Sequence, residues 1–426
     1  MAEYIFKYGK GEIALNINEG NVIGQLHGNS KEAIENIGQE LHKTLENPID
    51  SLPLKDLIGS DENITLVISD MTRYWMRQDL VIPHIIDYLN QNGVKDEAIT
   101  ILIANGTHLP APKSEIEMLV TKAIAERIKV VNHECESEEL VYVGTTTRGT
   151  KVELNPLAVN QKTICLGAAA HHLMAGFGGG RKSILPGVAS KKSINQNHIH
   201  ALSPNEPCSN PLIGNNKLSG NPLNEDMCEA AAMVNPLFII NLAMNPQGKL
   251  CRIFSGNWMT SWLECCKYVD EMYKVEISKK ADIVIAGCGG YPKDMSMYQS
   301  TKVVDNVEGA VKEGGTIILI SECCEGGGPE EYFGWSKFLK TGDLDKQLRA
   351  AFNIPGYVFY QNCEVAERIN LVLLSSIDKE KLAPMGITTF NTAEELLKNL
   401  DFENKDIYII EKGGTVIPQL STEKVT

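Results

Sequence analysis

Short runs of apolar, mostly β-branched residues alternate with segments of helical periodicity through most of this chain. Ile64–Ser69, Ala98–Ala104 and Thr163–Gly167 are three such runs, and amphipathic stretches separate them. A strand that is apolar on both faces is typical of a parallel sheet covered by helices on both sides. The alternation therefore predicts an α/β fold with mostly parallel sheets.

The pattern changes between residues 237 and 254, where two strand-like runs flank the turn sequence Asn245–Gly248 and predict a hairpin. A long helix is expected near 258–277, and the alternation then resumes with strands at 282–286, 316–320 and 370–374. Because 426 residues exceed the usual size of one core, we expect two α/β domains. Their predicted bounds are 1–274 and 275–405, with a tail, 406–426, that can return to the first domain. We expect the active site in the crevice between the domains.

Charge and composition exclude several classes of protein. The net charge of −14 argues against a nucleic-acid partner, although a local basic pocket for a small anion stays open. No run approaches ~18 uninterrupted apolar residues, and the first ten residues lead into no apolar signal region. The eleven cysteines are scattered without any Cys-x-x-Cys pair, which favours reduced thiols over a disulfide framework or a zinc site. We therefore expect a cytoplasmic enzyme that is not bound to a membrane.

Two loops that follow predicted strands carry polar residues suited to a small anionic ligand. Asp70 and Arg73 follow the strand at 64–69, and an Arg fork suits a carboxylate or phosphate. His108 ends the loop Asn105–His108 after the next strand, and its ordinary pKa suits proton transfer near neutrality. Taken alone, each loop is better explained without a function, by a capping Asp and a solvated Arg in the first and by a surface His in the second.

The segment from His171 to Ala189 is the most distinctive in the chain. It joins a His pair, a Gly-rich run and the sequence Arg181-Lys182-Ser183. Such glycines let backbone N–H groups point at an anion. A phosphate-binding loop of the G-x-x-x-x-G-K-[ST] type would need a second Gly where Arg181 stands, so a nucleoside triphosphatase is disfavoured.

Two further segments supply candidate ligands. Tyr298, Gln299 and Lys302 lie at a predicted helix start, and residues 299 and 302 share a face on which an amide and an ammonium can meet one carboxylate. His198 and His200 would share one side of a strand but not of a helix. A single His ligand implies that other donors complete the coordination of any metal.

Taken together, these segments resemble the nickel-dependent lactate racemase family over essentially the full chain. The Gly-rich run before Lys182 is the most specific match to the family. The Asp-x-Thr-Arg, Asn-Gly-Thr-His and Tyr-Gln-x-x-Lys motifs are short, and they occur in the same order as in the family. The resemblance implies a nickel-pincer nucleotide, pyridinium-3,5-bisthiocarboxylic acid mononucleotide nickel, joined covalently to Lys182. It also implies that enzymes building this cofactor act upstream.

The resemblance implies a role for each matching residue. His198 would bind Ni(II), and His108 and His172 would be the paired acid–base groups. The substrate carboxylate would be held by Arg73, Gln299 and Lys302. The residues expected to bind the cofactor are Lys182, Asp70, Thr72, Arg73, Gly178, Gly179, Gly180, Arg181 and Tyr298.

The implied reaction is the interconversion of D- and L-lactate by hydride transfer. Removing the hydrogen on the hydroxyl-bearing carbon as hydride avoids a dianion, and one His takes the hydroxyl proton as the hydride leaves. One N, one C and two S donors suit square-planar nickel. Two alternatives stay open: a racemase or epimerase of another 2-hydroxy acid, such as malate or a sugar acid, and a protein that binds a nucleotide without catalysis. The choice of His172 over His171 rests on spacing alone.

Overall fold

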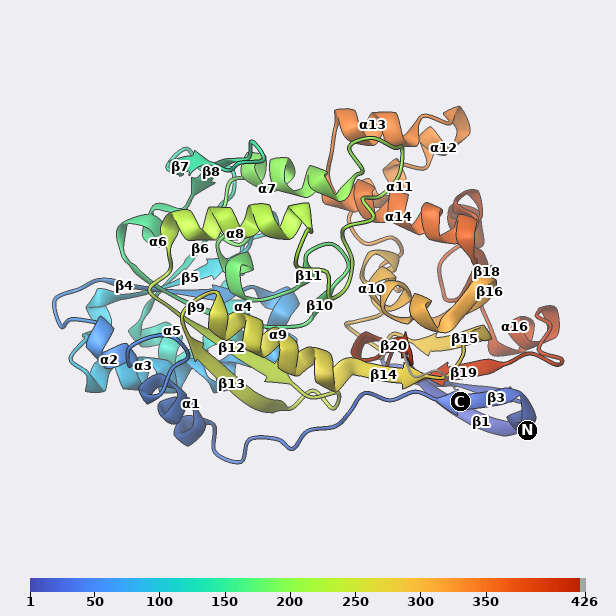
Figure 1. The fold of residues 1–426 in the computed structure, drawn as a ribbon, viewed down its shortest axis with the longest axis horizontal. Coiled ribbons are helices and arrows are strands. Elements are labelled where there is room, and N and C mark those ends of the chain that lie inside the picture. Colours follow the sequence, from blue (N-terminus) through green and yellow to red (C-terminus); the bar gives the residue numbers. More distant parts are fainter. Residues whose placement is uncertain (422–426) are drawn as a thin grey trace. The chain divides into compact units, whose positions relative to one another are not determined.

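The computed structural model describes residues 1–421 and divides the chain into two compact units (Figure 1). The central unit contains Ser30–His200 and Leu212–Met272. The terminal unit contains Met1–Asn29, Ala201–Pro211 and the chain from Tyr273 onward. Each unit is an α/β domain with a mainly parallel six-stranded sheet, as the alternating pattern predicts. No helix within residues 1–421 has the length and apolarity to cross a membrane.

The sheet of the central unit has the strand order β13-β12-β9-β4-β5-β6. All neighbours in it are parallel except β12 and β13, which form the predicted hairpin. Smaller antiparallel pairs are formed by β7 with β8 and by β10 with β11. The strands are β4 (Ile64–Ser69), β5 (Ile99–Ala104), β6 (Lys129–Asn132), β7 (Val141–Thr145), β8 (Lys151–Leu154), β9 (Lys162–Ala168), β10 (His171–His172), β11 (Gly176–Phe177), β12 (Phe238–Met244) and β13 (Leu250–Gly256).

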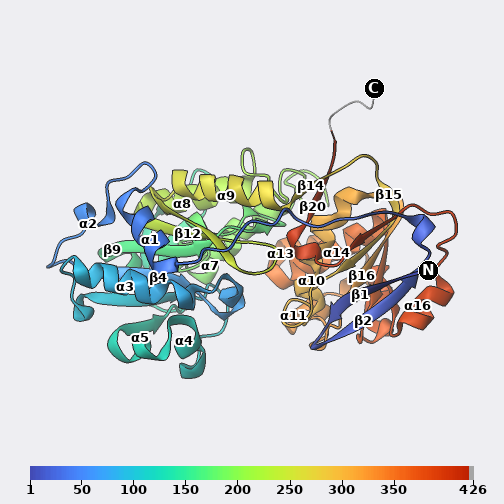
Figure 2. The same ribbon diagram turned by 90° about the horizontal axis from the view of Figure 1, so that it is seen from below.

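Helices cover both faces of the central sheet. Figure 2 shows α8 and α9 on one side of it, and α3 and α5 on the other. The helices are α1 (Ile37–Glu46), α2 (Leu54–Leu57), α3 (Ile82–Gln91), α4 (Lys113–Val120), α5 (Lys122–Arg127), α6 (Pro156–Asn160), α7 (Lys191–His198), α8 (Pro222–Val234) and α9 (Thr260–Tyr273). The helices α4 and α5 are separated at Thr121, whose positive φ of 74° ends the first helix and whose hydroxyl caps the second.

The terminal unit has an all-parallel sheet with the order β18-β17-β16-β15-β19-β3. Its remaining strands form the β1–β2 hairpin and the parallel pair β14–β20. The strands are β1 (Ala2–Tyr8), β2 (Gly11–Ile17), β3 (Val22–Gln25), β14 (Lys274–Ile277), β15 (Ala281–Gly287), β16 (Val311–Ile320), β17 (Asn370–Leu374), β18 (Thr388–Phe390), β19 (Ile407–Ile410) and β20 (Ile417–Leu420). The helices are α10 (Met297–Val307), α11 (Glu331–Gly334), α12 (Lys337–Thr341), α13 (Leu344–Ala350), α14 (Ile354–Arg368), α15 (Lys379–Leu382) and α16 (Ala393–Asn399).

These pairings correct the expected domain bounds. Residues 1–29 do not belong with the first domain, because β3 pairs with β19 at the edge of the terminal sheet and the β1–β2 hairpin packs on the same sheet. Residues 201–211 are also part of the terminal unit. The expected return of the tail to the first domain is also wrong. β19 lies between β15 and β3, and β20 pairs with β14. Residues 422–426 of that tail lie outside the described residues.

The β1–β2 hairpin buries one face against the terminal sheet. Phe6, Leu15 and Ile17 are at most 1% exposed and share a core with Ile285 and Ile320 of the sheet. Side chains alternate along a strand, so the neighbouring Ile5 points outward and is 49% exposed. The N-terminal 29 residues are thus an integral part of the terminal unit.

We expect Phe6→Ala to destabilise the terminal unit by about 3–5 kcal/mol, since it leaves a cavity in this core. Hydrogen–deuterium exchange followed by mass spectrometry should show faster exchange in β15 and β16 but not in β4 and β5. Ile5→Ala is the matched control and should leave both sheets protected. Equal loss of protection in both sheets would contradict the assignment of the N-terminal segment.

Candidate functional site

The site predicted from the sequence is built mainly at one edge of the central sheet. β4, β5 and β9 are parallel neighbours, so the loops that follow them leave from the same edge. These loops carry Asp70, His108 and the segment from His171 to Ala189. The backbone N–H of Gly106 donates to the carbonyl of Gly187 at 3.0 Å, which ties the second loop to the third.

Asp70 and His108 form a hydrogen-bonded pair. Oδ2 of Asp70 accepts a short hydrogen bond from Nδ1 of His108, and Oδ1 accepts from the hydroxyl of Thr72 at 2.7 Å. Arg73 lies 3.5 Å from the same carboxylate. Burial acts to raise the pKa of Asp70, but the hydrogen bond from His108 and the charge of Arg73 outweigh it, and the pKa is lowered. The carboxylate is therefore ionised, and it orients His108 in addition to any contact with a cofactor.

His171 and His172 point in different directions because they are neighbours on the short strand β10. The side chain of His171 is 2% exposed, packs against the ring of Phe177 at 4.7 Å, and lies 2.9 Å from Oδ1 of Asp270. Nδ1 of His172 instead accepts the backbone N–H groups of Met174 and Ala175, each at 3.2 Å. The interior position of His171 favours His172 as the functional member of the pair.

The Gly-rich run folds around the side chain of Arg181. This guanidinium is 1% exposed, donates to the carbonyls of Ala175 at 2.6 Å and Phe177 at 2.7 Å, and lies over the ring of Trp262. Burial lowers the pKa of Arg181 to about 10, so the group stays charged near neutrality. Arg181, which the resemblance includes among the cofactor-binding residues, thus holds the loop itself from within the protein.

Two glycines of the run have backbone conformations that other residues rarely adopt. Gly179 has φ 69° and ψ −169°, and Gly180 has φ 58°. A Cβ on Gly179 would lie 2.8 Å from the carbonyl oxygen of Ala168, and one on Gly180 would lie 2.4 Å from Trp262. Gly178 has no such constraint, since its Cβ would meet nothing closer than 3.6 Å. The sharp turn at 179–180 brings the chain directly to the half-buried Lys182.

The charge of Lys182 acts on His198, the last residue of α7. His198 is 3% exposed, and its Nδ1 donates to the carbonyl of Ile194 at 2.9 Å. Burial, and next the charge of Lys182, lower the pKa of His198 to about 3. The ring is therefore neutral, with Nε2 as the nitrogen that can bind a metal, and a hydrogen bond at the other nitrogen is typical of metal-binding histidines.

The residues around Lys182 and His198 fit a cofactor that brings its own metal donors. Within residues 1–421, no group of three or more His, Cys, Asp or Glu side chains is arranged to hold a metal. A single neutral imidazole together with the half-buried Lys182 fits such a cofactor. Two buried amide atoms near the same loops, Oδ1 of Asn105 and Nδ2 of Asn241, have no hydrogen-bond partner in the described part of the chain. Buried polar atoms are normally paired, so these two are candidate ligand contacts.

The remaining predicted residues lie in the terminal unit, at the start of α10. Ser296 caps this helix, with its Oγ accepting the backbone N–H of Gln299 at 3.4 Å. Nζ of Lys302 donates to Oε1 of Gln299 at 2.6 Å, so the predicted ammonium–amide pair exists on one helix face. Tyr298 is half-buried beside them. The contribution of α10 to the site stays a prediction.

Sequence reasoning missed several residues that shape the site. Asp270 and Trp262 both lie on α9, where nothing in the local sequence distinguishes them from other helix residues. The buried Asp226 on α8 accepts hydrogen bonds from Thr150 at 2.7 Å and from Asn197, the neighbour of His198, at 2.9 Å. Asn105, by contrast, belongs to the Asn-Gly-Thr-His motif and could have been found there.

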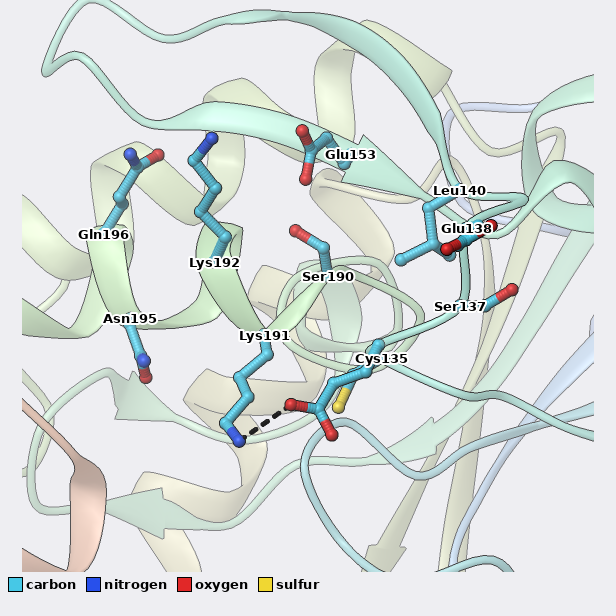
Figure 3. Close-up of a pocket in the computed structure, with 11 residues that line it drawn as sticks. Cys135, Ser137, Glu138, Leu140, Glu153, Ser190, Lys191, Lys192, Asn195 and Gln196 are labelled. Carbon is cyan, nitrogen blue, oxygen red and sulfur yellow. Dashed lines mark hydrogen bonds and ion pairs between the residues drawn. The ribbon is translucent and has the colours of Figure 1, made fainter.

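A separate hollow of about 650 Å³ lies at the other end of α7 (Figure 3). Its lining includes Lys191 and Lys192 of α7 together with Glu136, Glu138 and Glu153. Lys191 forms an ion pair with Glu136 at 3.0 Å. The hollow contains none of the predicted site residues, and we assign it no ligand.

Comparison with known proteins matches both halves of the chain to one family. Residues 8–209 match the model described as the lactate racemase N-terminal domain, and residues 276–417 match the lactate racemase C-terminal domain. A lactate racemase of Thermoanaerobacterium thermosaccharolyticum is 35% identical over 344 residues, which are 80% of this chain and 79% of that protein. A lactate racemase of Lactiplantibacillus plantarum is 31% identical over 352 residues, 82% and 81% of the two chains.

Two solved structures are similar to this one. The lactate racemase apoprotein from T. thermosaccharolyticum superimposes with a TM-score of 0.87 at 30% identity, covering 98% of this chain and all of that one. A protein from Thermotoga maritima superimposes with a TM-score of 0.66 at 17% identity, covering 93% of this chain and all of that one, and supports the fold alone.

We expect Gly179→Ala to destabilise the central unit, because the backbone conformation at 179 costs a non-glycine residue about 1–3 kcal/mol before the clash with Ala168 is counted. Gly178→Ala is the matched control one residue away and should change the free energy of unfolding by less than ~1 kcal/mol. Urea unfolding of both variants is the measurement. Similar losses in the two variants would show that the turn at 179–180 is not fixed as described.

Proposed function

The chain belongs to the lactate racemase family, and we propose that it interconverts D- and L-lactate with a nickel-pincer nucleotide attached to Lys182. The observation that carries the proposal is the buried His198, whose Nδ1 donates to the carbonyl of Ile194 and leaves Nε2 for a metal, in the segment that follows the Gly-rich run and the half-buried Lys182. A neighbouring Asp–His pair supplies a proton-exchanging group. The racemase activity follows from the family, whereas lactate as substrate and the mechanism are our proposals.

We propose that Lys182 carries the cofactor and that Nε2 of His198 binds its nickel. When bound, this cofactor supplies an electron-poor pyridinium ring that accepts the hydrogen on C2 of the substrate together with its electron pair. Gly178, Gly179, Gly180 and Tyr298 are proposed to line its site, along with Asp70 and Thr72.

The chain's own residues bind the substrate and move its hydroxyl proton. Nδ1–H of His108 is held by Asp70, so Nε2 is the atom that can take the proton of the hydroxyl as C2 is oxidised. His172 is proposed as the second group at that oxygen. The resulting 2-oxo acid is planar at C2, and it can be reduced from either face.

Arg73 is proposed to bind the substrate carboxylate, with Gln299 and Lys302 as its partners. The side chain of Arg73 is 39% exposed, and its ion pair with Asp70 at 3.5 Å leaves the fork with donors for a second carboxylate. The amide and ammonium of Gln299 and Lys302 already lie together on α10.

A racemase of a different 2-hydroxy acid is the second candidate function. Trp75, two residues after this arginine in the chain, is 38% exposed, and a bulky side chain near the carboxylate-binding group is the kind of feature that selects among substrates of different size. A protein that binds the cofactor without catalysis is disfavoured by the Asp70–His108 pair, since cofactor binding alone requires no oriented base.

We expect the chain, when produced together with the enzymes that build the cofactor, to convert L-lactate to a 1:1 mixture of enantiomers. Chiral chromatography started from each enantiomer measures this, and enantiopure malate and larger 2-hydroxy acids form the comparison panel. Protein produced without those enzymes should be inactive and nearly nickel-free, because one imidazole cannot hold Ni(II) tightly. A higher kcat/KM for another member of the panel would replace lactate as the substrate.

We expect Lys182→Ala to fold normally but to carry no covalent cofactor. Half-exposed loop lysines contribute little to packing, so the free energy of unfolding should change by less than ~0.5 kcal/mol. Intact-protein mass spectrometry is the measurement, and Lys192→Ala, an exposed lysine on α7, is the control that should keep the adduct. An adduct that persists in Lys182→Ala would exclude this lysine as the attachment site.

A further inference from the structure

The helix α7, which ends at His198, is too short to be stable without support from the rest of the protein. It has eight residues, and isolated helices of fewer than about 12 residues are marginal in water. Ser190 caps its first turn, with its hydroxyl accepting the backbone N–H of Ser193 at 3.0 Å. The helix packs against β8 and α8 (Figure 1). Its last turn, which carries His198, therefore depends on contacts outside the helix.

Asn197 makes such a contact from the last turn. Its side chain is fully buried, and Nδ2 donates to Oδ2 of Asp226 at 2.9 Å and to the carbonyl of Leu223 at 3.1 Å. Both partners are acceptors, so the orientation of the amide is fixed and both hydrogens of Nδ2 are used. Leu223 and Asp226 lie on α8. The end of α7 is thus bonded to α8 one residue before His198.

The carboxylate of Asp226 is itself held in place by a second element. It is fully buried, and it also accepts hydrogen bonds from the hydroxyls of Thr146 and Thr150, in the turn between β7 and β8. The hydroxyl of Thr146 in turn accepts the backbone N–H of Thr150 at 3.1 Å. A buried carboxylate is costly unless its oxygens are paired, and here three donors pair them. Asp226 therefore offers Asn197 a partner with a fixed position.

The hydrogen bond of His198 itself cannot replace this link. Nδ1 of His198 donates to the carbonyl of Ile194, one turn earlier on the same helix. This bond orients the ring relative to α7, but it does not fix α7 within the central unit. The bond between Asn197 and Asp226 does so, because it joins α7 to a different helix.

We propose that Asp226 is a positioning residue for the metal-binding histidine, and that it acts through Asn197 by fixing the last turn of α7. This inference rests on the proposed function, in which Lys182 carries the cofactor and Nε2 of His198 binds its nickel. With a single protein ligand, the metal site is sensitive to any movement of that ligand. Residues that orient metal ligands typically contribute about 10–100-fold to metal affinity or activity.

The first test measures how well the cofactor-loaded chain retains nickel. Asn197→Leu removes the link and leaves Asp226 paired with both threonine hydroxyls. Asp226→Asn is the conservative variant, since it keeps an oxygen that can accept from Asn197. Thr147→Val is the matched control, because this hydroxyl lies in the same turn but donates to Glu229. The rate of nickel release to a chelator is measured, and intact-protein mass spectrometry reports the adduct on Lys182.

We expect Asn197→Leu to release nickel about 10–100-fold faster than the unsubstituted chain, with the adduct on Lys182 retained. Asp226→Asn and Thr147→Val should release it at nearly the unchanged rate. Unchanged release from Asn197→Leu overturns the proposal, and so does release from either other variant as fast as from Asn197→Leu. Asn197→Ala, which adds no bulk, repeats the test if the leucine variant does not fold.

The second test needs no cofactor. The full chain is labelled with ¹⁵N-histidine, and long-range ¹H–¹⁵N correlation spectra are recorded at pH about 8, where an ordinary histidine is neutral. His198→Gln identifies the ring by the signals it removes. We expect one set of His198 signals with a protonated Nδ1 in the unsubstituted chain and in Asp226→Asn, and broadened or doubled signals in Asn197→Leu.

A His198 spectrum that is unchanged in Asn197→Leu overturns the proposal, because the ring then keeps its place without the link to Asp226. The two proposals can fail separately. If no nickel cofactor attaches to Lys182, the proposed function fails, whereas the spectra of the cofactor-free chain still decide whether Asp226 positions this ring.

Discussion

The candidate site depends on the hydrogen bonds that the buried guanidinium of Arg181 donates within its own loop. A buried charge is costly unless its donors are satisfied, and this one is satisfied by carbonyls of the loop that contains it and by Oδ1 of Asn224 at 2.9 Å. Because the arginine occupies the interior of the loop, the adjacent lysine is left half-buried at its surface. The glycines at 179 and 180 permit this arrangement, since any side chain there would meet the backbone of Ala168 or the ring of Trp262.

This loop also connects the histidines of the site to one another. The strand β10 carries His172 and pairs with β11, which directly precedes the glycines at 178–180. After Lys182 the chain passes Gly187, whose carbonyl accepts a hydrogen bond from the His108 loop. It then enters α7, which ends at His198. The loop is thus joined to the segments that carry all three histidines by chain connectivity and backbone hydrogen bonds. The network around Asp226 provides separate support for the end of α7 through Asn197.

The local sequence pattern was sufficient to predict most of the strands and the order in which the motifs occur along the chain. Buried parallel strands are apolar on both faces, which is why β4 was predicted with its observed bounds and β5 and β9 within one residue at each end. Contacts between residues that are far apart in the sequence could not be predicted. The pairing of β3 with β19 joins residues at opposite ends of the chain, and no local periodicity encodes it. The same holds for the His pair, because the residue that distinguishes His171 from its neighbour is Asp270, 99 positions away.

In the proposed function, the cofactor supplies most of the metal ligands and the protein supplies the groups that handle protons. A protein that bound nickel by itself would need several converging ligands, and the described residues offer a single imidazole whose second nitrogen is fixed by Ile194. In the proposed function, the donors of the cofactor would therefore select the metal. In this proposal, the protein positions two histidines at the substrate hydroxyl: the carboxylate of Asp70 holds Nδ1 of His108, and two backbone N–H groups donate to Nδ1 of His172. Hydrogen-bond partners alone can orient two identical side chains differently, because an acceptor at Nδ1 fixes the ring proton there, whereas a donor at Nδ1 fixes the lone pair.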